Sequence, residues 1–66
     1  MKRFYLLEKV QEGVYTPVDE VLCEVDAVRE REVVVRDTIS MEGVEGRWEE
    51  KVVAIEGKDG RLYLPL

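Results

Sequence analysis

The chain has 66 residues, of which 45% are hydrophobic and 38% are charged, and its formal net charge is −5. A chain this short is expected to form one small domain, residues 1–66, with a limited core. Its composition argues against a membrane span, because no apolar run is long enough, and against an internal disulfide or a Cys/His zinc site, because it has one cysteine and no histidine. A core this small is expected to be marginally stable unless something adds to its stability. With a disulfide and a zinc site excluded, self-association is the source of stability that remains.

The first predicted element is a strand over residues 2–10. Gln11-Glu12-Gly13 has the composition of a turn and ends it. The middle of the run is apolar on both faces, which is typical of a strand inside a sheet. Its apolar residues are Phe4, Tyr5, Leu6, Leu7 and Val10.

Residues 16–32 fit two structures, and the choice between them decides the fold class. Thr16 suits a helix cap, and Pro17 suits the first helical position. The apolar residues that follow fall on an arc of about 120°, with acids in the first turn and arginines in the last, as the helix dipole favours. We therefore predict a helix over residues 17–31. The residues of the arc are Val18, Val21, Leu22, Val25 and Val28.

The alternative for the same segment is a pair of strands. Valine loses side-chain freedom in a helix and packs well on a pleated sheet, and most of the apolar residues here are valine. Val21, Cys23, Val25 and Ala27 also alternate along the chain as they would on one face of a strand.

The second half of the chain predicts three strands. The β-branched run at residues 32–40 predicts the first, and residues 47–56 predict the second. Residues 41–46, with two glycines and no apolar pattern, predict a surface loop between them. Asp59-Gly60 predicts a tight turn into a last strand over residues 61–66, because glycine supplies the positive φ that such turns require.

The predicted fold is therefore α+β, with one helix packed on a small, mainly antiparallel four-stranded sheet in the order β-α-β-β-β. If residues 17–31 are strands, the same chain becomes an all-β barrel or roll of five to six strands.

No residue pattern indicates catalysis, and we expect no enzyme activity, cofactor or metal. Without histidine the usual general base is missing, and Cys23 has acidic neighbours that would make its thiol less reactive. The carboxylates lack the spacing of a calcium loop, and a domain this small leaves little volume for a catalytic cleft.

The residues that favour partner binding are aromatic or acidic. Trp48 is either a core residue or an interface anchor, and the same two interpretations apply to Tyr5 and Tyr63. The second interpretation follows from the prevalence of aromatic side chains in binding hot spots. On the helical interpretation four acids form an exposed face that could meet a basic protein. These acids are Asp19, Glu20, Glu24 and Asp26.

The leading functional hypothesis is a non-enzymatic interaction module that forms a homo-oligomer. The alternative is an acidic regulatory protein that binds a basic groove of a larger, nucleic-acid-binding protein. Direct nucleic-acid binding is not expected, because the arginines are interleaved with acids rather than clustered.

No signal-peptide core is expected before Glu8 and Lys9, so we predict a cytoplasmic location. The lack of asparagine, with many glutamates and arginines, resembles the composition of heat-adapted proteins.

Overall fold

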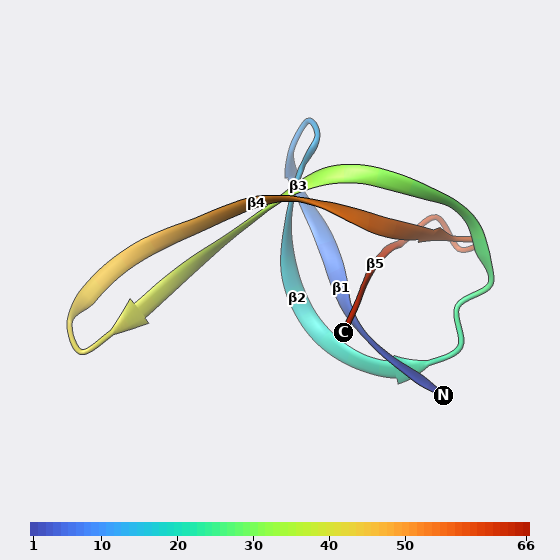
Figure 1. Cartoon of the computed structure of the whole chain (residues 1–66), viewed down its shortest axis with the longest axis horizontal. Coiled ribbons are helices and arrows are strands. Elements are labelled where there is room, and N and C mark those ends of the chain that lie inside the picture. The colour runs from blue at the N-terminus through green and yellow to red at the C-terminus, as the bar shows by residue number, and fades with distance from the viewer.

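The computed structural model describes all 66 residues and contains five β-strands and no helix. The strands close into a barrel in the order β1-β2-β3-β4-β5, with β5 pairing back onto β1 (Figure 1). The all-β alternative is therefore confirmed, and the α+β fold is wrong. No helix that could cross a membrane is present. The strands are β1 (Lys2–Gln11), β2 (Val14–Cys23), β3 (Ala27–Met41), β4 (Val44–Gly57) and β5 (Leu62–Pro65).

The segment predicted as a helix forms the end of β2, a short connection and the start of β3. Pro17 pairs with Leu7 and Asp19 pairs with Leu6, so Val18 between them has no partner of its own and forms a bulge. A bulge is one of the few places where a strand tolerates proline, whose ring nitrogen cannot donate a hydrogen bond. The apolar residues expected on one face of this helix do not pack together on a core. Leu22, for example, is 63% exposed. The preference of valine for a pleated sheet prevails over the helix-cap signal.

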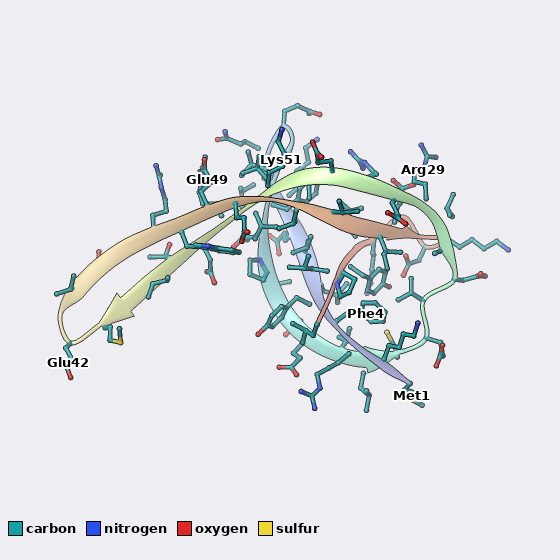
Figure 2. The ribbon with its side chains drawn as sticks, in the orientation of Figure 1. Met1, Phe4, Arg29, Glu42, Glu49 and Lys51 are labelled. Carbon is teal, nitrogen blue, oxygen red and sulfur yellow. The ribbon has the colours of Figure 1, made fainter.

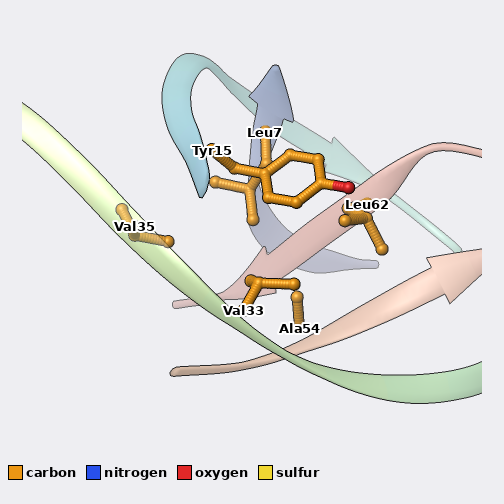
Figure 3. Packing of buried hydrophobic residues seen from close by; sticks show 6 residues of the cluster. All are labelled: Leu7, Tyr15, Val33, Val35, Ala54 and Leu62. Carbon is orange, nitrogen blue, oxygen red and sulfur yellow. The ribbon is translucent and has the colours of Figure 1, made fainter. Parts of the chain in front are cut away.

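The core is small and lies where all five strands meet. Only ten residues of the chain are buried, and Val35 and Ala54 are the two with no exposed surface. Figure 3 shows the side chains of the central cluster converging from every strand. Phe4 and Tyr63 pack edge to face beside it, with their ring centroids 5.8 Å apart. The central cluster consists of Leu7, Tyr15, Val33, Val35, Ala54 and Leu62.

The barrel is closed by two unequal seams. Strands β2 and β3 run parallel and pair only at Val14 with Val34 and Tyr15 with Val35. Strands β1 and β5 are antiparallel and pair over residues 4–7 and 62–65, and the Leu66 amide donates a further hydrogen bond to the Arg3 carbonyl at 3.0 Å. The seam between the first and last strands is therefore the more extensive of the two.

The predicted C-terminal hairpin is confirmed. Gly60 has a φ of 83°, and the Gly60 amide donates to the Gly57 carbonyl at 3.0 Å. The Asp59 carboxylate accepts hydrogen bonds from the Arg61 amide at 3.0 Å and from the Tyr63 hydroxyl at 2.6 Å. Gly57 is tightly enclosed, because a Cβ there would lie 2.8 Å from the Asp59 Oδ1 atom and 3.0 Å from the Tyr63 ring. This turn is fixed by side chains as well as by its backbone.

The loop predicted over residues 41–46 is wrong in extent. Strands β3 and β4 remain paired as far as Met41 with Val44, so the connection is only Glu42 and Gly43. Both have positive φ, 51° and 81°, as the type I′ turn of a two-residue hairpin requires. The hairpin runs far beyond the barrel, and the molecule measures 40 × 26 × 15 Å (Figure 1). We refer to residues 36–49, which project from the barrel, as the arm.

Candidate interaction surface

The arm has one apolar face and one polar face. In an antiparallel pair, residues directly opposite one another point to the same side of the sheet. Asp37 lies opposite Trp48, Ile39 opposite Gly46, and Met41 opposite Val44. We call the four large apolar residues on this side the apolar arm face. It consists of Ile39, Met41, Val44 and Trp48.

The other side of the arm is covered by charged and hydroxyl side chains. Arg36 lies opposite Glu49, and its Nε atom is 2.8 Å from the Glu49 carboxylate. Figure 2 shows Glu49 and Lys51 on this side of β4 and Glu42 at the tip of the arm. This side is suited to water, in contrast to the apolar arm face. The remaining arm residues on it are Thr38, Ser40, Glu45 and Arg47.

The apolar arm face is a continuation of the barrel core. Every second residue of β3 points to the same face of the sheet. Val33 and Val35 on this face lie in the core, and Ile39 and Met41 lie further along the same face, in the arm. Inside the barrel these positions are covered by other strands, whereas in the arm nothing covers them. Ile39, Met41, Val44 and Trp48 are 49%, 69%, 71% and 37% exposed. A contiguous apolar patch of this kind, on the order of 400 Å², is of a size that often marks an interaction site.

A groove lies where the arm leaves the barrel. It has a volume of about 260 Å³, reaches down to the buried Val35, and has Trp48 at the side of the arm. Trp48 also lines a second, more open hollow on the arm, together with Ile39, Met41 and Val44. Trp48 therefore joins the groove to the apolar arm face. The other residues that line the groove are Tyr5, Pro17, Val18, Asp19, Glu20, Asp37 and Leu64.

The structure brings together four of the seven residues predicted to bind a partner. Trp48, Tyr5, Asp19 and Glu20 all line the groove. Tyr63 does not belong to this surface, because it is 8% exposed and packs against Phe4 in the barrel.

Glu24 and Asp26 are also separate from the groove. Both lie in the connection between β2 and β3, where the Glu24 carboxylate is 3.4 Å from the N-terminal amine. The carbonyl of Asp26 accepts a hydrogen bond from the Lys58 amide at 2.8 Å. The four acidic residues that were expected on one exposed face therefore do not lie together, because the structure has no helix that would align them.

Sequence reasoning missed Ile39, Met41 and Val44 as surface residues. Met41 and Val44 lie within the segment whose two glycines indicate a loop, and Ile39 lies near the end of the strand predicted before it. The available signal was the spacing of two residues that runs from Val33 through Val35 to Ile39 and Met41, interrupted only by Asp37. A strand that keeps this pattern beyond the length needed for the core must present its apolar side elsewhere.

The shifted pKa values of the turn between β4 and β5 belong to structural contacts away from the groove. The hydrogen bond from the Tyr63 hydroxyl, followed by that from the Arg61 amide, lowers the pKa of Asp59. The same bond to Asp59 raises the pKa of Tyr63. No group of three or more Asp, Glu or Cys side chains is arranged so that it could hold a metal ion.

Comparisons with protein-family models, with curated proteins and with solved structures gave no match for this chain. The geometry of the arm and of the groove is therefore the basis for a functional argument.

Proposed function

We propose that this protein is a non-enzymatic interaction module that self-associates through its apolar arm face. The observation that carries the proposal is the uncovered continuation of the core along the arm, where Met41 and Val44 are 69% and 71% exposed. Exposing such a patch to water is unfavourable by about 25 cal/mol for each Å². Burial against another protein surface removes that cost.

A second copy of the chain is the partner that fits this face best. The arm is a two-stranded ribbon, and two ribbons can stack face to face at a separation of about 10 Å, as sheets do in sandwiches. A twofold axis would place the same patch on both sides of the contact. Each arm would contribute on the order of 400 Å² of apolar surface, on the order of 800 Å² for the pair, which is the size of a weak interface that forms at high protein concentration.

An acidic regulatory protein that binds a basic partner is the second candidate, and one observation favours it. Of the fifteen side-chain carboxylates, six lie within 4.0 Å of a cationic nitrogen of the same chain. The others leave negative charge free for a partner, although they are spread over the surface. A cytoplasmic location, in which the Cys23 thiol stays reduced, is part of both proposals.

Ile39 and Thr38 provide a matched test of the leading proposal, because they are neighbours on opposite sides of the arm. Size-exclusion chromatography with light scattering should give a dimer for the wild-type chain at high micromolar concentration. Ile39→Glu places a charge on the apolar arm face and should give a monomer, whereas Thr38→Glu adds the same charge to the polar side and should remain a dimer. A wild-type monomer across this range, or equal behaviour of the two variants, would refute self-association through this face.

A further inference from the structure

We propose that the groove at the base of the arm binds an arginine side chain of a partner protein. This inference goes beyond self-association, because it concerns the barrel side of Trp48 rather than the tip of the arm. It rests on the shape of the groove, on its aromatic lining and on its uncompensated charge.

The lining of the groove suits the flat, weakly hydrated guanidinium group. Trp48 and Tyr5 contribute aromatic rings, and Leu64 contributes apolar surface next to the buried Val35. Arginine packs its plane and its aliphatic stem against such surfaces and keeps its N–H groups free for acceptors. The volume of about 260 Å³ is enough for one side chain and too little for a folded element.

Three carboxylates surround this apolar lining, and one cation offsets them. Asp19, Glu20 and Asp37 line the groove. Glu20 lies 3.3 Å from the Nε atom of Arg3, which is itself 67% exposed. Neither Asp19 nor Asp37 has a cationic nitrogen within 4.0 Å; the nearest arginine in sequence, Arg36, lies on the other side of the arm and pairs with Glu49.

Asp37 is held in place without being neutralised. Its Oδ1 atom accepts a hydrogen bond from the Thr38 amide at 2.9 Å, which fixes the side chain without bringing a cation to it. Asp19 follows the bulge at Val18, where the ladder between β1 and β2 shifts register. An occupant that brings a positive charge would complement both carboxylates, and a guanidinium can donate to two acceptors at once.

The same charges disfavour the tip of a second copy as the occupant of the groove. The tip carries Glu42, with Glu45 beside it on β4, and would bring carboxylates toward Asp19 and Asp37. Like charges brought together in this way are repelled. The apolar arm face is therefore suited to another copy, and the groove is suited to a cationic residue of a different protein.

Titration of the isotope-labelled, full-length protein with N-acetyl-arginine methylamide tests this directly by NMR. The indole N–H of Trp48 is a unique probe, since the chain has one tryptophan. We expect the Trp48 indole signal and the Leu64 amide signal to shift and to saturate. The citrulline counterpart has nearly the same shape without the charge and should bind at least about fivefold more weakly, because the charged hydrogen bonds are lost.

Two variants that remove one negative charge each complete the test. Asp37→Asn changes the groove and should weaken binding of the arginine derivative at least about fivefold. Glu45→Gln removes the same charge from the polar side of the arm and should leave binding unchanged. Asp19→Asn provides a second groove variant if Asp37→Asn alters the dispersed spectrum of the folded protein.

Three results would overturn the proposal. The first is equal binding of the arginine and citrulline derivatives, and the second is equal binding to the Asp37→Asn and Glu45→Gln variants. The third is a set of shifts that spreads over all exposed carboxylates and omits the Trp48 indole. Repeating the titration with the Ile39→Glu variant separates this site from self-association, because that change leaves every groove residue intact.

Discussion

Replacing residues 38–47 by Asn-Gly would remove most of the arm while preserving its base. Asp37 and Trp48 lie directly opposite one another, so two residues can connect them as a tight hairpin. Asn-Gly is suited to the type I′ turn that such a connection adopts. The shortened chain keeps all five strands and every residue of the groove.

We expect this change to cost the barrel less than about 1 kcal/mol of unfolding free energy, because it removes no buried contact. All ten buried residues lie outside residues 36–53. Val35→Ala supplies the contrast. It removes two carbon atoms from a side chain with no exposed surface, at about 0.8 kcal/mol each plus the cavity left behind, for a loss of about 2 kcal/mol. A domain of this size has a total stability of about 3–10 kcal/mol.

Urea unfolding followed by circular dichroism would measure both losses. The protein concentration should be in the low micromolar range, so that self-association does not contribute to the measured stability. A shortened chain that is unfolded, or that loses as much stability as Val35→Ala, would refute the reasoning. The arm would then be part of the cooperative fold rather than a free surface.

Two further predictions concern the turn between β4 and β5. Gly57→Ala should destabilise the barrel by about 1–3 kcal/mol, because the added methyl group meets the Asp59 carboxylate and the Tyr63 ring; a midpoint of urea unfolding equal to that of the wild type would contradict this. The second prediction follows from the pKa of Asp59, which the Tyr63 hydroxyl bond lowers first and the Arg61 amide lowers further. The folded protein therefore binds this proton less readily than the unfolded chain, so the stabilising contribution is present above about pH 4 and is lost as the pH falls through the folded pKa. Tyr63→Phe should flatten the acid side of the dependence of melting temperature on pH, and an unchanged slope between pH 2 and pH 5 would argue against the assignment.

Short-range signals in the sequence predicted the local structure that they determine. Asp59-Gly60 specifies a turn through the backbone freedom of glycine, and the β-branched run at Val33 to Val35 specifies a strand through its own side chains. Both signals act within a few residues, and both predictions are confirmed. The prediction of a helix over residues 17–31 is wrong, and the sequence signals behind it were equally local. Thr16 and Pro17 suit a cap, but a bulge opposite Leu7 accommodates the same proline and depends on a partner strand that the segment does not contain.

The candidate surface was partly predictable for a similar reason. Residue type alone indicated Trp48, Tyr5, Asp19 and Glu20, and all four line the groove. Their proximity depends on pairing between β1 and β2 and on the course of β3 and β4, which no single segment encodes. Only a helical periodicity would place Glu24 and Asp26 beside Asp19 and Glu20, and the structure has no helix there. The apolar arm face was missed because Gly43 and Gly46 suggested that the pattern stopped, whereas Gly46 simply continues β4.

The antiparallel seam between β1 and β5 has a consequence for the order in which the chain can fold. Its partners are Phe4 with Pro65 and Leu7 with Leu62, so the ladder joins residues from the two ends of the chain. While a ribosome is synthesising the chain, the long β3–β4 hairpin can form from residues near one another in sequence. The pairing of β1 with β5 must wait until Leu62–Pro65 have emerged. Until Tyr63 has emerged, Phe4 lacks the aromatic ring that packs against it. We therefore expect the nascent chain to remain sensitive to proteases until β5 has left the ribosome, and then to become resistant in a single late step.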